Sequence, residues 1–105
     1  MQETTVFEPA REELELAAVL AALSDPIRLE LVRALHDAGE ASCGSIVTHI
    51  PKSTRSHHLK VLREAGVTKT RLEGTERIVR LRYDCLQARF PGLLDAVLGA
   101  TSKQP

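Results

Sequence analysis

The stretch Ser53–Gly66 constrains this chain most, because its residues form a consistent pattern only when it is read as a helix. That helix places Leu59, Leu62 and Ala65 on one side. Ser53 is the predicted N-cap, and Gly66 follows the end, where a left-handed residue is favoured. The other sides carry polar and basic side chains: Thr54, Arg55, His57, His58 and Lys60. Polar residues at the N-terminal half with apolar residues behind them are typical of a DNA recognition helix and also of an ordinary amphipathic surface helix.

Length and composition predict one small domain with an aliphatic core. The chain has 105 residues, of which only 3% are aromatic. We assign residues 11–100 to the domain, residues 1–10 to a flexible N-terminal arm and residues 101–105 to a tail. Two cysteines are too few for a disulfide scaffold, and no apolar run reaches membrane-spanning length. We therefore expect a cytoplasmic protein.

The net charge is zero, but the charges are unevenly distributed. Residues 1–40 carry nine acids and three bases, a net charge of −6, whereas residues 52–82 carry nine bases and three acids, a net charge of +6. Such asymmetry indicates an electrostatic footprint on one part of the molecule. It coincides with the recognition-helix candidate, which favours a DNA-binding function over a merely solvated charged face.

The flanking sequence predicts the remaining elements. Helices are expected at 11–23 and 26–38, the second capped by Asp25, started by Pro26 and buried around most of its circumference. A short helix over 42–50, closed by Pro51, would form a helix-turn-helix with the recognition helix. Residues 67–73 and 76–83 alternate like a β-hairpin, a wing beside that motif. A last helix from 84 to 99 should break near Phe90, because Pro91 follows it. The predicted fold class is therefore mainly α with a small β-hairpin (α+β), a winged helix-turn-helix in the order α-α-α-α-β-β-α.

Three segments in this order carry a resemblance to a known family: residues 22–35 (ALSDPIRLELVRAL), 53–67 (STRSHHLKVLREAGV) and 71–82 (RLEGTERIVRLR). The chain resembles the ArsR/SmtB family of bacterial winged-helix repressors over about residues 14–98. The resemblance implies a homodimer that binds an operator in double-stranded DNA and changes affinity when an effector binds. In the cell, such a protein would associate with the nucleoid while bound to DNA.

The resemblance and the side-chain chemistry together nominate DNA-contacting residues. Arginine and lysine donate to guanine or phosphate, and serine and histidine reach either. The nominated set is Lys52, Ser53, Thr54, Arg55, Ser56, His57, Lys60 and, on the wing, Arg77. His58 immediately precedes the core residue Leu59, so we interpret it as a structural histidine.

Apolar stripes on the first and last helices predict the dimer interface. A terminal helix rich in leucine, in a chain with few core residues, is most simply explained by dimerisation with the first helix, although packing within its own domain is the alternative. The predicted interface residues are Leu16, Val19, Leu20, Leu93, Leu94, Val97 and Leu98.

The sequence departs from the family at the metal sites. Metal-sensing members carry a Cys-X-Cys pair where this chain has Ser42-Cys43-Gly44, and residues 84–100 contain no histidine. We therefore expect no metal site of the family type and no cofactor, although His49, His57 and His58 leave weak opportunistic metal binding open. Cys43 and Cys85 could instead form a thiol-based redox sensor, since each is predicted near a helix N-terminus, or they could be small buried apolar residues.

Two other function classes were weighed. One is a winged-helix protein-interaction module that acts through a co-regulator. The other is an enzyme, which we do not expect, because the chain has no glycine-rich phosphate loop, no HisGluXXHis motif and no nucleophile–base pair at suitable spacing. The sequence does not name the effector, the operator or the regulated genes.

Overall fold

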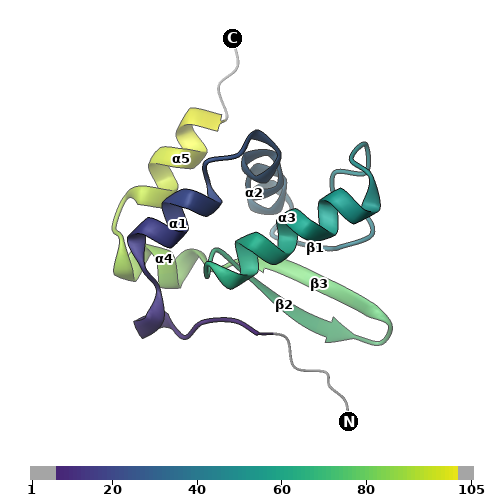
Figure 1. The fold of residues 1–105 in the computed structure, drawn as a ribbon, viewed down its shortest axis with the longest axis horizontal. Coiled ribbons are helices and arrows are strands. Elements are labelled where there is room, and N and C mark those ends of the chain that lie inside the picture. Colours follow the sequence, from purple (N-terminus) through teal and green to yellow (C-terminus); the bar gives the residue numbers. More distant parts are fainter. Residues whose placement is uncertain (1–6, 102–105) are drawn as a thin grey trace.

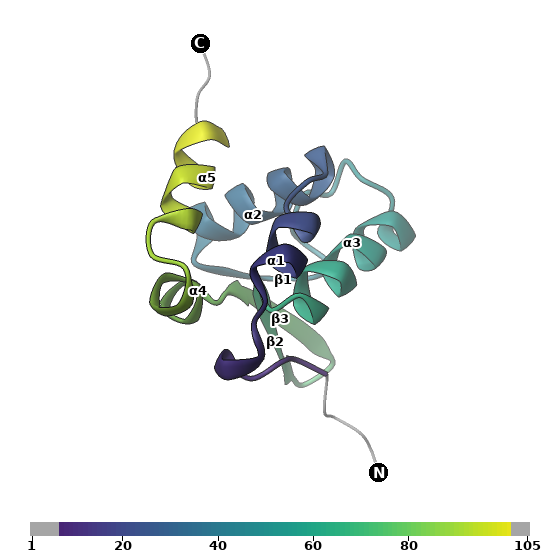
Figure 2. The ribbon, with the colours of Figure 1, turned by 60° about the vertical axis from the view of Figure 1, so that its left-hand side comes forward.

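The structure is a computed structural model that describes residues 7–101 of the chain, with helices gathered on one side of a small sheet (Figures 1 and 2). The elements confirm the fold class, mainly α with a β-hairpin wing. In chain order they are a 3-10 turn η1 (Arg11–Glu13), α1 (Leu16–Ala22), α2 (Pro26–Ala38), β1 (Glu40–Ser42), α3 (Lys52–Glu64), β2 (Thr68–Glu73), β3 (Glu76–Leu81), α4 (Tyr83–Arg89) and α5 (Leu93–Thr101).

The sheet is antiparallel with the strand order β1-β3-β2. The predicted hairpin is confirmed as β2 and β3, with Thr68 opposite Leu81 at its base. The sequence analysis missed β1, which pairs Ala41 with Val79. Three residues are too few to show an alternating pattern, and β1 exists only because β3 offers it a free edge.

Helix α2 forms the centre of the fold, as predicted, since it contacts α3, α5, β1 and β3. The prediction that it is buried around most of its circumference is wrong, because only the face with Leu31, Val32 and Leu35 is fully buried. The Asp25 side chain accepts hydrogen bonds from the backbone N–H groups of Ile27 and Arg28 at 2.8 and 3.1 Å, and Pro26 occupies the first turn. The inward residues of α2, Leu31, Val32 and Leu35, are fully buried. Within the described chain, the buried residues of this core cluster are all aliphatic.

The predicted helix over 42–50 is wrong, because this segment folds as a series of turns. Its backbone bonds join residues three apart, such as Ser45 N–H to the Ser42 carbonyl at 3.1 Å. Val47 has a φ of +49°, which no α-helix contains. Ile46 and Ile50, whose spacing of four residues suggested a helix, are both buried. Their side chains therefore anchor a loop rather than a helix. Pro51 restricts the backbone of Ile50 and favours this outcome.

The first helix is shorter than predicted. The chain turns at η1, extends through Leu14 and Glu15, and becomes helical only at Leu16. The reason is tertiary: Leu14 inserts into the core against Gly66, where a β-carbon would lie 2.0 Å from the leucine Cδ2 atom. Gly66 has a φ of +90°, which confirms its predicted place after the recognition helix.

The ends of the other helices follow the prediction with one exception. The last helix breaks at Phe90, as expected, into α4 and α5. Ser53 is not the N-cap of α3, since that helix begins one residue earlier behind Pro51 and has no side-chain cap.

Residues 7–9, which were assigned to the flexible arm, are each hydrogen-bonded to a distant part of the chain. Arg63 donates to the Phe7 carbonyl at 3.1 Å and Arg82 to the Pro9 carbonyl at 2.6 Å, and the Glu8 carboxylate accepts from the Thr70 N–H at 2.6 Å. Residues 1–6 and 102–105 lie outside the described residues, and so does most of the predicted tail. No helix within the described range has the length and apolarity needed to cross a membrane.

Candidate nucleic-acid interface

Helix α3 divides its residues between solvent and core as the sequence predicts. Leu59 and Leu62 are buried, whereas five polar side chains are exposed: Lys52, Ser53, Ser56 and His57 in the N-terminal half and Lys60 beyond it. Thr54 is half-buried. The first four form a polar surface at the helix N-terminus, where a recognition helix contacts base edges.

Arg55 departs from its predicted role. Its residue is only 7% exposed, and its guanidinium donates to the Ile50 carbonyl at 3.2 Å. That bond satisfies a buried acceptor of the turn segment before α3. Arg55 therefore stabilises the start of the recognition helix through a buried hydrogen bond. It does not belong to the exposed residues that could contact DNA.

His58 is structural, as the sequence analysis interpreted it. It is 8% exposed and lies 3.0 Å through Nδ1 from the Arg28 guanidinium on α2. Arginine has no acceptor, so Nδ1 accepts and the ring is the neutral Nε2–H tautomer. Its neighbour His57 remains exposed, with the two rings 5.2 Å apart edge to face.

A groove of about 510 Å³ separates α3 from the wing. Lys52 and Ser56 line one wall, and Arg77 at the start of β3 lines the other. Arg77 is exposed, and its carbonyl accepts from the Cys43 N–H at 2.9 Å, which ties the turn segment to the wing. The groove thus brings together recognition-helix and wing residues that are far apart in the sequence.

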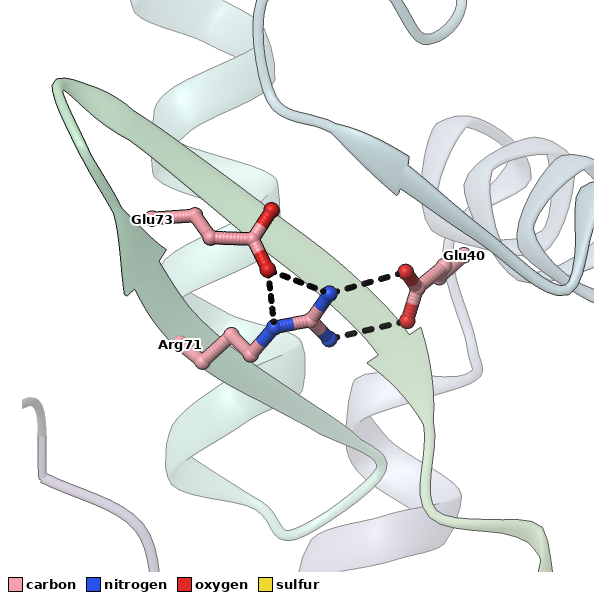
Figure 3. Close-up of polar contacts among 3 residues, drawn as sticks. All are labelled: Glu40, Arg71 and Glu73. Carbon is pink, nitrogen blue, oxygen red and sulfur yellow. Dashed lines mark hydrogen bonds and ion pairs between the residues drawn. The ribbon is translucent and has the colours of Figure 1, made fainter.

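Arg71 is held in place by two carboxylates. Figure 3 shows its guanidinium between Glu40 of β1, at 2.8 and 2.9 Å, and Glu73 of β2, at 3.1 and 3.2 Å. This cation holds the pKa of Glu40 below its ordinary value, and the carboxylates raise the pKa of Arg71. The pairing with Glu40 was not predicted, because Glu40 reaches Arg71 only through the unpredicted strand β1, whereas Glu73 lies with Arg71 on the predicted hairpin.

The predicted dimer residues separate into two groups. Leu16 and Leu20 on α1 are each 46% exposed, and Leu93 and Val97 on α5 are half-buried. The other three are buried inside the protomer: Val19, Leu94 and Leu98. These three belong to the core rather than the surface, because α1 packs against α3, and α5 packs against α2 and α4.

The two cysteines have different surroundings. Cys43 lines the groove, and burial raises the pKa of its thiol. Cys85, on α4, receives a hydrogen bond from the Arg82 guanidinium at 3.6 Å, and the neighbouring Arg11 and Arg82 lower the pKa of its thiol. Among the residues described, both are free thiols, and no three histidine, cysteine or acidic side chains gather where they could hold a metal ion.

Comparison with known proteins also indicates a helix-turn-helix protein. Residues 23–71 match a family described as a helix-turn-helix domain. The chain is 43% identical over 84 residues to the uncharacterized HTH-type transcriptional regulator YceK of Bacillus subtilis, across 77% of this chain and 84% of that protein.

Two solved structures are similar across most of the chain. The transcriptional repressor BigR from Xylella fastidiosa has a TM-score of 0.65 and 34% identity, covering 85% of this chain and 88% of that one. The homodimeric winged helix-turn-helix DNA-binding domain Mb0332 from Mycobacterium bovis, described as a possible ArsR-family transcriptional regulator, has a TM-score of 0.66 and 28% identity, covering 84% and 82%.

Proposed function

The chain belongs to the ArsR/SmtB family of helix-turn-helix transcriptional regulators, and from this premise we propose that it is a homodimeric repressor, released from a pseudo-palindromic operator by an effector. One observation carries the proposal: the exposed polar N-terminus of α3 faces Arg77 of the wing across a groove. The same proposal puts the protein in the cytoplasm, on the nucleoid while it is bound to DNA.

The exposed residues divide into two roles by chemistry. Ser56 and His57 sit on the first turns of α3, where side chains reach base edges. Lys52, Lys60 and Arg77 carry charges that neutralise phosphates. The first group would set sequence preference, and the second would set affinity for any DNA.

Exposed leucines on α1 supply the argument for a dimer. Leu16 and Leu20 lie four residues apart on one face of a seven-residue helix, and α5 adds the half-buried Leu93 and Val97. A two-fold dimer would present two α3 helices, which implies two half-sites about one helical turn of DNA apart.

The proposal is tested by DNA titrations of the purified chain alone, using a duplex that the chain enriches from a randomised library and a scrambled duplex. Arg77→Ala should weaken binding to both duplexes, whereas His57→Ala or Ser56→Ala should reduce the preference for the enriched one. Arg80→Ala is the matched control, since it removes the same charge from β3 at a residue that does not line the groove. Failure of the wild type to enrich any duplex would refute the proposal and favour an interaction module that needs a co-regulator.

A thiol response is a second candidate, favoured by the guanidinium groups beside Cys85. A thiolate is the reactive form, and those cations stabilise it. DNA affinity of the wild type and of the Cys43→Ser/Cys85→Ser variant, each with and without diamide, tests the idea. Equal affinity in all four samples would leave the cysteines as packing residues.

A further inference from the structure

The side chain of Arg28 joins three helices through two hydrogen bonds. From the first turn of α2, its Nε donates to the Ala22 carbonyl at 2.6 Å, and its Nη1 donates to Nδ1 of His58 at 3.0 Å. Ala22 is the last residue of α1, and His58 lies in the middle of α3. Figures 1 and 2 show α1 beside α3, so this guanidinium lies at the junction of the helices.

Both acceptors need this donor. A carbonyl at a helix C-terminus has no partner within its own helix, and the Ala22 residue is buried. His58 is also buried, and a buried imidazole nitrogen without a donor costs free energy. Arginine meets both needs, because its planar fork presents several N–H groups in fixed directions.

The position of Arg28 is itself defined by the backbone. Asp25 caps the first turn of α2 and accepts from the Arg28 N–H at 3.1 Å. The guanidinium therefore extends from a fixed point toward α1 and α3. On another side of α1, Leu16 and Leu20 face solvent.

We propose that Arg28 is a positioning residue that couples α1 to the recognition helix through His58. The inference rests on the proposed function, in which α1 forms the dimer face and α3 reads DNA. A shift of α1 in the dimer moves the Ala22 carbonyl, and Arg28 transmits that shift to α3. The bond to His58 thereby sets the angle at which Ser56 and His57 meet the DNA.

The test compares three single variants for binding to the enriched and the scrambled duplex, together with their Tm. Arg28→Met keeps the aliphatic stem without the donors, and His58→Leu removes the acceptor. Arg33→Met is the matched control, because Arg33 is also on α2 and donates to a carbonyl, that of Leu98 on α5, at 3.1 Å. We expect Arg28→Met and His58→Leu each to lower the preference for the enriched duplex about tenfold, and the double variant to lose no more than either one. Arg33→Met should lower Tm and leave the preference unchanged.

Rescue by a second acceptor separates positioning from general stability. His58→Asn puts an oxygen acceptor near the place of Nδ1, so it should retain the wild-type preference for the enriched duplex, whereas His58→Leu should not.

Two outcomes would overturn the inference: equal loss of preference in Arg28→Met and Arg33→Met, or additive losses in the Arg28→Met/His58→Leu double variant. A wild-type chain that enriches no duplex would refute the proposed function instead, so the two failures are distinguishable.

Discussion

Arg55 and His58 show how a helix can carry fewer DNA contacts than its charges suggest. Both lie on α3 next to the exposed Ser56 and His57, yet both are buried and bonded to the protein, Arg55 to the turn segment and His58 to Arg28. They are three residues apart, which puts them on the inner face of the helix. A polar side chain on a recognition helix can therefore serve the fold rather than the DNA.

Gly66→Ala should destabilise the protein more than Gly74→Ala, by about 1–3 kcal/mol. Both glycines have a positive φ, +90° and +63°, so both substitutions carry backbone strain. Only at Gly66 does the new β-carbon meet a neighbour, Leu14, whereas nothing lies within 4 Å of it at Gly74. Chemical denaturation of both variants measures the difference, and equal losses would contradict the close approach of Leu14.

Asp25→Ala should lower the Tm by about 4–8 °C at pH 7, because α2 loses its N-cap. The pKa of Asp25 is lowered, chiefly by the hydrogen bond from the Arg28 N–H. A depressed carboxyl pKa stabilises the fold above the unfolded value, near 3.9, and this contribution is lost as the pH falls through the folded pKa. The difference in Tm between wild type and variant should therefore shrink below about pH 4. A difference that stays constant from pH 7 to pH 3 would exclude a role for the carboxylate charge, and Asp37→Ala, also on α2, is the control.

At the level of elements, α1 and α5 each have a buried face and a face open to solvent. The buried faces contribute Val19, Leu94 and Leu98 to the core. On α1 the open face keeps Leu16 and Leu20, and more than a third of each leucine remains exposed. The apolar residues of these two helices therefore divide between the core of the protomer and its surface. Only those at the surface are available to contact a second subunit.

The double variant Leu16→Glu/Leu20→Glu should be a folded monomer, whereas Leu94→Glu/Leu98→Glu should unfold. Charges at the first pair replace exposed apolar surface, but charges at the second pair would be buried without partners. Sedimentation velocity at micromolar concentration gives the oligomeric state, and circular dichroism gives the fold. A Leu16→Glu/Leu20→Glu variant that remains dimeric would remove α1 from the interface.

For the molecule as a whole, the basic charge of residues 52–82 is only partly free. Arg71 is paired with two carboxylates, Arg55 is buried, and Arg82 donates to the Pro9 carbonyl. The exposed bases proposed above to contact phosphates, Lys52, Lys60 and Arg77, are three of the nine that the sequence contains.

The salt dependence of DNA binding should report this smaller number. Each neutralised phosphate contributes a slope of about −0.9 to the plot of log K against log salt, so about three contacts per protomer predict a slope near −5 for a dimer. Titrations between about 50 and 200 mM salt measure it. A slope near zero would argue against DNA binding through phosphates, and a slope corresponding to nine contacts per protomer would show that Arg55 and Arg71 are released on binding.

The features that the sequence alone determined are local ones. Helix α2 was predictable because its cap, its first-turn proline and its apolar residues lie within one short stretch. The break at Phe90 was predictable because Pro91 acts on its immediate neighbour. The alternation of β3 and the exposed polar residues at the start of α3 likewise follow from the period of a strand and of a helix.

The tertiary structure decided what depends on contacts between distant segments. Strand β1 forms because β3 is present to pair with it. Turns replace the predicted helix at 42–50, and in this conformation Ile46 and Ile50 are still buried. Leu14 interrupts the first helix to fill the space beside Gly66. The same holds for three arginines, Arg28, Arg55 and Arg71. The guanidinium of each donates to at least one acceptor on another element or turn of the fold. Periodicity reports which face of an element is apolar, but it does not report which distant acceptor a polar side chain will meet.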